Sequence, residues 1–246
     1  MQEAELQNKT LPFIVPSIYI LLIWGLYALE IKYGFNLNKY GVFPRTIEGL
    51  RGIVFMHFLH SNTSHLFNNS IPLFLLLSSL FYFYKDIAFK ILILGGLLTG
   101  FATWLIARDS YHIGASGIVY LLFSFVFFSG IIRKHYRLVA LSFIVIFLYG
   151  SMIWYVFPIK DGMSWEGHLS GFVTGLVLAF IQSQKNKKLK LSSIKRKLKS
   201  LNHTYQLKFD SNHDTQLRIH TQVLYRFWPL ERLRSRISVS RLLGLV

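Results

Sequence analysis

The feature that most constrains this chain is a series of apolar runs, each about as long as a lipid bilayer is thick. A helix needs roughly 20 apolar residues to cross the hydrocarbon core. Six runs approach this length, at residues 12–31, 66–84, 88–107, 113–132, 138–157 and 165–182. Because 52% of the residues are hydrophobic and only 15% are charged, the runs predict an all-α, polytopic membrane protein with six transmembrane helices.

Positive charge is concentrated in the C-terminal part. Residues 185–246 hold 15 Lys and Arg against 3 Asp and Glu, and so carry +12 of the formal net charge of +16. We therefore divide the chain into a membrane domain, residues 1–184, and a basic tail, residues 185–246. Charge confined to a tail of this kind does not imply a nucleic-acid partner.

Apolar residues recur in the first part of the tail at three- and four-residue steps, at Leu191, Ile194, Leu198 and Leu201. One interpretation is a basic amphipathic helix on the cytoplasmic leaflet, attracted to anionic membrane lipid. A solvated tail is the alternative, and the pattern leaves both open. Residues 202–246 indicate no particular fold or role.

The connections between the runs differ in charge, and the difference predicts the orientation. On one side the connections and the start of the tail are basic, with Lys85, Lys90, Arg133, Lys134, Arg137 and Lys185. On the other side the two short connections carry only Arg108 and Lys160, each next to an aspartate, while the long first loop carries Lys39, Arg45 and Arg51 as a contrary signal. By the positive-inside rule we expect both termini in the cytoplasm, with the protein in a prokaryotic cytoplasmic membrane. The long first loop, residues 32–65, then lies outside as a folded or interfacial segment.

Polar residues open three of the six runs. The second run begins with His65 and Asn69, the fourth with Ser116 and the sixth with His168. These runs share one direction, and a helix rises only about 1.5 Å per residue, so the four side chains are expected in one layer near the outer face. Ionisable residues inside spans are costly and are functional candidates by default.

The layer contains the groups that nucleophilic catalysis requires. A serine hydroxyl becomes an effective nucleophile when a base removes its proton, and a neutral imidazole is the usual base. Ser116 is therefore the candidate nucleophile and His168 the candidate base, with His112 as the next candidate. Tyr120 lies one turn after Ser116 on the same helix face, where its ring can either stack on His168 or pack in the core.

Acyl transfer also needs hydrogen-bond donors aimed at the developing oxyanion. The Asn69 amide is one candidate, and His65 lies one turn before it on the same face. The backbone N–H of Ser116 is a third, because such groups are unpaired at a helix start. A polar cluster that bonds to a neighbouring helix is the alternative interpretation of His65 and Asn69.

Close approach of the fourth and sixth runs is required, since the hydroxyl and the imidazole must come within about 3 Å. Small residues allow this approach in lipid. Gly114 and Gly117 flank the serine, while Gly171 and Gly175 follow the histidine by one and two turns.

In combination, these motifs resemble those of the rhomboid intramembrane serine proteases. The resemblance covers about residues 10–184 and rests on His60-x4-His65-x3-Asn69, Gly114-Ala115-Ser116-Gly117 and His168-x2-Gly171-x3-Gly175. It implies a six-helix bundle that cleaves transmembrane-helix substrates near the outer membrane face.

The same resemblance implies a role for each site residue. Ser116 would be the nucleophile and His168 the general base, with Tyr120 stacked on the imidazole. The oxyanion hole would consist of His65, Asn69 and the backbone amide of Ser116.

Other classes of membrane protein fit the sequence less well. A catalytically silent rhomboid-like adaptor that binds transmembrane segments remains an alternative, although such relatives usually lack the serine or the histidine. A transporter would place ionisable residues along a path through the bilayer, and a metalloprotease would need His-Glu-x-x-His. With no cysteine in the chain and no such motif, we expect no metal and no cofactor.

The fifth run is the candidate entrance for substrate, because it carries no member of the polar layer. The loop after it, residues 158–164, contains Gly162 and Met163. We expect this segment to form a gate, with Met163 and Phe157 covering Ser116 when it is closed. The alternative is that the bulky side chains belong to the interfacial aromatic belt.

Overall fold

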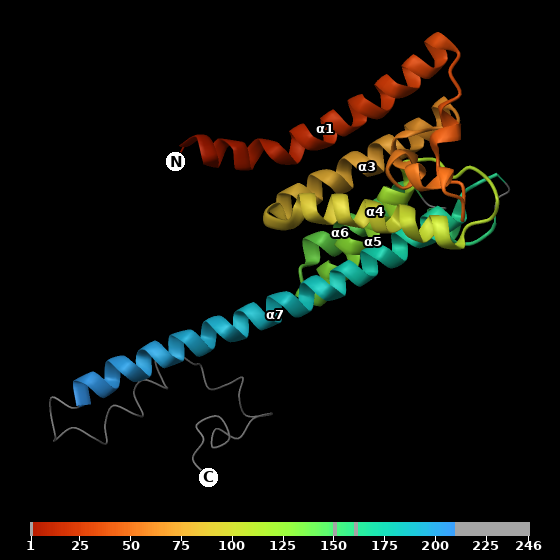
Figure 1. Cartoon of the computed structure of the whole chain (residues 1–246). Coiled ribbons are helices and arrows are strands. Elements are labelled where there is room, and N and C mark those ends of the chain that lie inside the picture. The colour runs from red at the N-terminus through yellow and green to blue at the C-terminus, as the bar shows by residue number, and fades with distance from the viewer. Residues whose placement is uncertain (1, 150–151, 160–161, 210–246) are drawn as a thin grey trace. The chain divides into compact units, whose positions relative to one another are not determined.

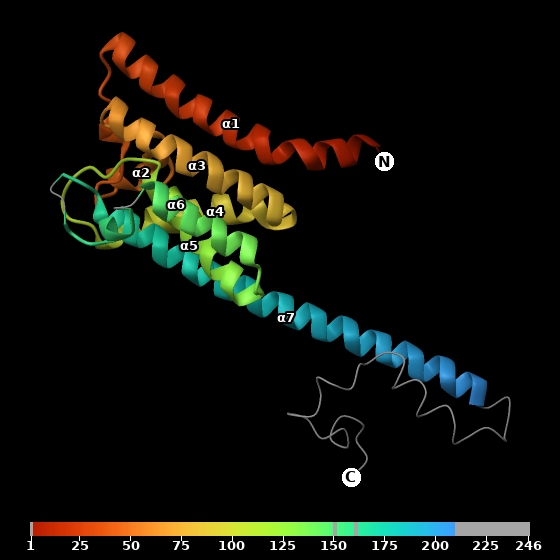
Figure 2. The same ribbon diagram turned by 180° about the vertical axis from the view of Figure 1, so that it is seen from behind.

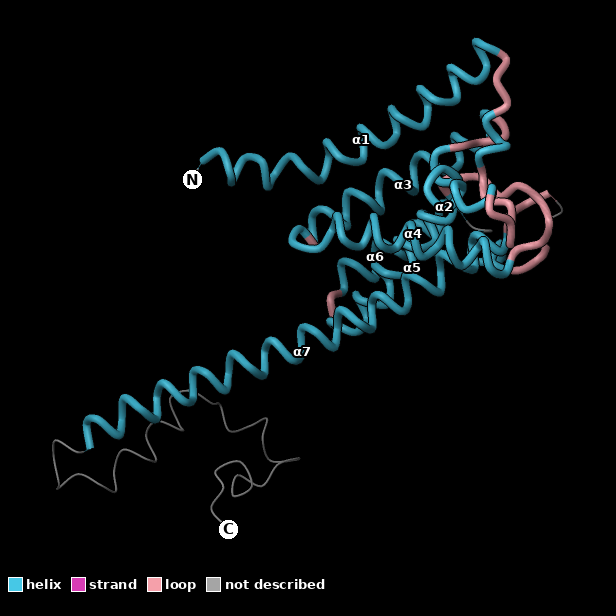
Figure 3. The backbone as a smooth tube through the Cα atoms, in the orientation of Figure 1, coloured by secondary structure: helices cyan, strands magenta, loops and turns pink. Residues whose placement is uncertain are grey.

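The computed structural model describes residues 2–149, 152–159 and 162–209, and this part of the chain is mainly helical (Figure 3). An isolated antiparallel bridge joins Val42 to His112. In chain order the elements are α1 (Gln2–Tyr33), η1 (Leu37–Tyr40), η2 (Glu48–Arg51), α2 (Gly52–Phe55), η3 (Met56–Phe58), α3 (Thr63–Phe83), η4 (Lys85–Ile87), α4 (Ala88–Ile106), α5 (Ser116–Arg133), α6 (Tyr136–Tyr149), η5 (Met152–Val156) and α7 (Trp165–Phe209).

The all-α membrane fold predicted from the sequence is confirmed. Four of the described segments are long and apolar enough to cross a membrane, at Thr10–Tyr33, Thr63–Phe83, Lys85–Ile106 and Ser116–Arg133. Two more correspond to the fifth and sixth predicted runs, a shorter apolar helix at Tyr136–Phe147 and the first part of α7. The count of six spans stays a prediction.

In two of the predicted runs the helix covers less of the sequence than expected. The fourth run was expected to be helical from residue 113, but α5 begins at Ser116, because Gly114 has a φ of +124° that no helix accommodates. The fifth run was expected to continue to residue 157. Instead α6 ends at Tyr149, and a separate 3-10 helix, η5, lies beyond residues 150–151, which are outside the described part.

The chain divides into two compact units, Met1–Asn186 and Lys187–Val246. The assignment of residues 1–184 as a protease domain and of residues 185–246 as a basic tail remains a prediction. In the second unit α7 continues to Phe209, and the side chains of Leu191, Ile194 and Leu198 are exposed. An amphipathic row on a helix is therefore present, while its contact with a membrane surface stays a prediction.

Helix α5 is the centre of the first unit. Within its apolar segment 72% of the residues are buried in the protein, against 17% for α1. Helix α3 packs against both α1 and α5, and α5 also contacts α4 and α6 (Figures 1 and 2). Large side chains of α1 such as Phe13, Ile18 and Leu21 are correspondingly exposed, as expected for a helix that faces lipid.

The packing of α7 on α5 depends on two glycines. A Cβ added at Gly171 would lie 2.2 Å from the carbonyl oxygen of Gly117, and one at Gly175 would lie 2.2 Å from that of Leu121. Both distances are far below van der Waals contact, so the two backbones touch at these points. This is the close approach expected of a small-x-x-x-small pair.

The first loop is folded, and it closes the end of the bundle at which α3, α5 and α7 begin. Its short helices η2 and α2 pack on α4, while η3 contacts α1 and α5. The His57 Nε2–H donates to the carbonyl oxygen of Gly96 at 3.0 Å. The bridge from Val42 to His112 ties the loop to the segment before α5. Gly49, Gly52 and Gly100 lie where any Cβ would meet backbone atoms, so the loop is closely packed.

Substitution of Gly175 by alanine is expected to destabilise the protein. The added methyl group has to displace the α5 backbone, and overpacking of this kind typically costs about 1–3 kcal/mol. The melting temperature in detergent should therefore fall for Gly175→Ala. Gly25→Ala is the matched control, since a Cβ at Gly25 meets nothing within 4 Å; equal melting temperatures for the two variants would contradict this packing.

Acid is expected to destabilise the protein through His57. Burial lowers the pKa of His57 from 6.5 to about 4. Between these values the unfolded chain binds the proton and the folded chain does not, so stability falls as the pH decreases from 6.5 to 4, by roughly 3 kcal/mol in total. His57→Gln keeps a donor for Gly96 but cannot titrate. Its melting temperature should depend less on pH across this window than that of the wild type, and identical slopes would refute the assignment.

Candidate active site

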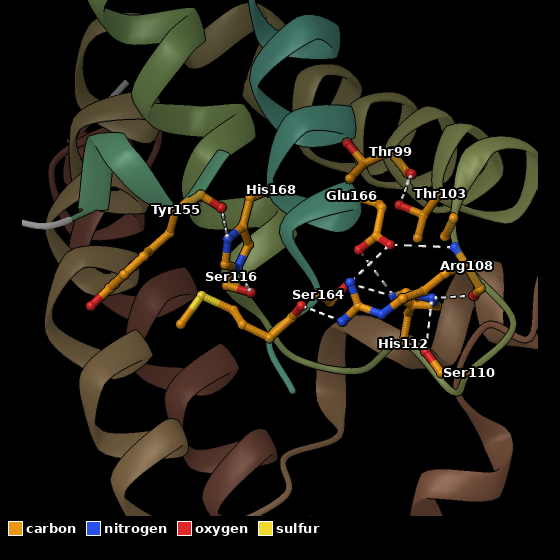
Figure 4. Close-up of polar contacts among 12 residues, drawn as sticks. Thr99, Thr103, Arg108, Ser110, His112, Ser116, Tyr155, Ser164, Glu166 and His168 are labelled. Atoms are coloured by element: carbon orange, nitrogen blue, oxygen red, sulfur yellow. Dashed lines mark hydrogen bonds and ion pairs between the residues drawn. The ribbon is translucent and has the colours of Figure 1, made fainter. Parts of the chain in front are cut away.

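The starts of α5 and α7 bring a serine and a histidine into direct contact. The Ser116 hydroxyl lies 2.9 Å from Nε2 of His168 (Figure 4). Ser116 is the first residue of α5, and His168 lies in the first turn of α7. The His168 side chain is buried, while Ser116 is only partly buried. This geometry suits transfer of the serine proton to the imidazole.

The imidazole is held by two further contacts. Nδ1 of His168 lies 2.8 Å from the backbone carbonyl oxygen of Tyr155. Because a carbonyl only accepts, Nδ1 carries the proton and Nε2 presents a lone pair to Ser116. The Tyr120 ring stacks on the His168 ring, with centroids 4.4 Å apart and planes inclined by 17°. Sequence reasoning proposed the stacking but missed Tyr155, because a backbone carbonyl leaves no signature in side-chain identity.

The segment before Ser116 is fixed by the first loop. The backbone N–H of Gly114 donates to the carbonyl oxygen of Met56 at 2.8 Å, and that of Ala115 donates to Nε2 of His60 at 3.3 Å. Burial, with a smaller contribution from His65, lowers the pKa of His60 to about 3. The His60 ring is therefore neutral near pH 7 and keeps the lone pair that accepts from Ala115.

Two candidate oxyanion donors belong to the first turns of α3. A side chain on Gly114 would begin 2.8 Å from the His65 ring and 3.3 Å from the Ser116 hydroxyl. His65 and Ser116 therefore flank the same small space, which stays open because residue 114 is glycine. Asn69 is buried, and its side-chain NH₂ has no hydrogen-bond partner among the described residues. A buried amide donor without a partner is costly; the role of Asn69 toward an oxyanion stays a prediction.

His112, the second candidate base, is not available to Ser116. Its Nδ1 lies 2.7 Å from the Ser164 hydroxyl and its Nε2 lies 2.9 Å from the carbonyl oxygen of Arg108. Both nitrogens are thus occupied by other partners, and the contact of Ser116 is with His168.

The expected gate is described only in part. Trp154 and Phe157 are exposed, and Gly162 has a φ of +75°, which favours glycine. Residues 150–151 and 160–161 lie outside the described part, and the gating role of the segment remains a prediction.

The fold and the arrangement of this site define a class of membrane protein, and comparison with known sequences agrees. Residues 48–185 match the Rhomboid domain, which is more than half of the chain. The chain belongs to the rhomboid family, and with its apolar helices it is an integral membrane protein.

Relatives in mycobacteria extend the similarity. Uncharacterised proteins of Mycobacterium tuberculosis (strain ATCC 25618 / H37Rv) and Mycobacterium bovis are each 34% identical over 185 residues, which cover 69% of this chain and 75% of theirs. An uncharacterised protein of Mycobacterium leprae is 31% identical over 200 residues, covering 74% of this chain and 77% of its own. These relatives support the family and not a particular activity.

Replacement of Asn69 by alanine is expected to slow turnover without abolishing it. Loss of one oxyanion donor typically costs about 3–4 kcal/mol, and the remaining donors can share the loss. The measurement is kcat for a transmembrane substrate, beside labelling by a fluorophosphonate probe, which should persist. Asn68→Ala is the matched control, because Asn68 is the exposed neighbour on the same helix. Unchanged turnover for Asn69→Ala would contradict the oxyanion role and leave Asn69 with a packing role.

Proposed function

We propose that this protein is a serine endopeptidase that cleaves transmembrane-helix substrates with a Ser116–His168 dyad. The observation that carries the proposal is the 2.9 Å contact between the Ser116 hydroxyl and a histidine whose other nitrogen is bound to the Tyr155 carbonyl oxygen. Membership of the rhomboid family adds support, since many members of that family are intramembrane proteases.

The geometry suggests the course of the reaction. His168 Nε2 takes the proton of the Ser116 hydroxyl as its oxygen attacks the carbonyl carbon of the substrate peptide bond. Asn69, His65 and the backbone N–H of Ser116 stabilise the tetrahedral oxyanion. The protonated His168 then gives its proton to the leaving amine, and water, activated by the same imidazole, hydrolyses the acyl-enzyme.

The alternative function is a catalytically silent adaptor that binds transmembrane segments. Such a protein has no need of an oriented hydroxyl–imidazole pair, nor of a buried amide donor left without a partner. The paired and oriented dyad therefore favours the enzyme.

The location of cleavage follows from the predicted orientation. The dyad lies where α5 and α7 begin, and the charge of the loops predicts that this end is extracytoplasmic. The substrates are then membrane proteins cut near the outer end of a transmembrane helix, in the cytoplasmic membrane of a prokaryote.

Removal of the dyad tests the proposal directly. Ser116→Ala should abolish fluorophosphonate labelling and cleavage of a transmembrane substrate in liposomes. His168→Ala should lower cleavage by roughly 10²–10⁴-fold or more, because the two residues act as a unit. Ser124→Ala is the matched control, since Ser124 is a buried serine two turns further along α5.

Ser116→Ala and His168→Ala are both expected to insert and purify like the wild type. The protease assignment fails if Ser116→Ala cleaves at the wild-type rate. It fails equally if the wild type neither labels nor cleaves any membrane substrate while its melting temperature shows it to be folded, and that outcome favours the adaptor.

A further inference from the structure

A second polar cluster lies beside the dyad and takes no part in the chemistry described above (Figure 4). Its centre is Glu166 in the first turn of α7, whose side chain is only 2% exposed. Oε1 of Glu166 accepts hydrogen bonds from the backbone N–H of Arg108 at 3.3 Å and from its Nη1 at 3.1 Å. A buried carboxylate is costly unless it is paired and hydrogen-bonded, so this pairing is what allows a glutamate here.

His112 and the loop before α7 complete the cluster. The His112 Nε2–H donates to the carbonyl oxygen of Arg108, and Nδ1 accepts from the Ser164 hydroxyl. Burial lowers the pKa of His112, which keeps the ring neutral near pH 7. Arg108 Nη2 also donates to the carbonyl oxygen of Met163 at 2.6 Å.

These bonds join the segment that leads to the nucleophile with the helix that carries the base. Ser116 follows His112 by four residues, and His168 follows Glu166 by two. The carbonyl oxygen of Ser164 additionally accepts from the backbone N–H of His168 at 3.3 Å. The cluster therefore links the two segments that carry the ends of the 2.9 Å dyad contact.

Orientation of His168 does not require Glu166, because the Tyr155 carbonyl oxygen already binds Nδ1. Bulk packing does not require a charge either, since apolar residues often replace a buried ion pair without loss of stability. What the ion pair adds is a fixed geometry between two segments, through bonds that have direction.

We propose that Glu166 is a positioning residue for the reaction at Ser116, acting through Arg108 to set the separation of the Ser116 hydroxyl and the His168 imidazole. The inference rests on the proposed protease function and goes beyond it. Glu166 touches neither reacting atom, so its removal should affect the chemical step and not the binding of substrate.

The test compares the full-length wild type with Glu166→Gln, Arg108→Gln and the double variant in liposomes. Each single change should lower kcat on a transmembrane substrate about tenfold or more, with KM within about twofold. The double variant should lose no more than the more affected single variant, because both changes remove one contact. Glu166→Asp keeps the charge and should recover part of the rate.

Asp109→Asn is the matched control. Asp109 lies next to Arg108 in the same segment, and it forms an exposed ion pair with Arg45. Because exposed pairs contribute little, this variant should retain the wild-type kcat. Fluorophosphonate titration gives the concentration of active sites, so that kcat is compared per folded enzyme.

The outcomes separate this inference from the proposed function. If Glu166→Gln keeps the wild-type kcat, the inference is overturned and the protease assignment stands. This holds whether or not the melting temperature of the variant is lowered. If Glu166→Gln does not purify in a folded form, Arg108→Gln decides, because the Arg108 side chain is 44% exposed and its replacement leaves Glu166 bonded to the backbone N–H. A wild type without labelling or cleavage overturns both.

Discussion

The contact between the backbones of α5 and α7 is the constraint on which the rest of the structure depends. Gly171 and Gly175 let α7 reach the carbonyl oxygens of α5, and this approach brings the Ser116 hydroxyl within 2.9 Å of the imidazole of His168. In lipid the hydrophobic effect does not drive helices together, so close packing of small residues and interhelical hydrogen bonds have to do so. The same contact that stabilises the bundle therefore also assembles the site, and one residue type at two positions serves both purposes.

The contacts that hold His168 against Ser116 are made by uncharged groups. Among the described contacts of His168 there is no carboxylate; a backbone carbonyl fixes its tautomer instead. The buried carboxylate of Glu166 is turned to Arg108, whose side chain reaches solvent. The buried charge of Glu166 is thereby paired with a cation that reaches the surface, while neutral hydrogen bonds and ring stacking hold His168.

Much of the fold and of the candidate site could be predicted because both follow from side-chain identity and spacing. Apolar runs of bilayer length indicated the helices, and the shared direction of three runs placed His65, Ser116 and His168 in one layer. What could not be predicted depends on backbone geometry. Residue type does not reveal that the carbonyl oxygen of Tyr155 binds His168, nor that α6 is shorter than the fifth apolar run. The pairing of Glu166 could not be predicted either, because its partner Arg108 comes from a loop whose path the sequence does not define.

The first loop fixes the backbone that leads to Ser116. Ser116 sits at the end of a helix, where backbone is ordinarily free to move, yet reactivity requires its hydroxyl in one place. Bonds to Met56, His60 and Val42 hold the segment from residue 112 to residue 115. These bonds come from a loop that is itself packed too closely for a Cβ at Gly49 or Gly52. The position of Ser116 is thus fixed by residues distant in the sequence, and the contact that fixes His168 comes from a different segment, through the carbonyl oxygen of Tyr155.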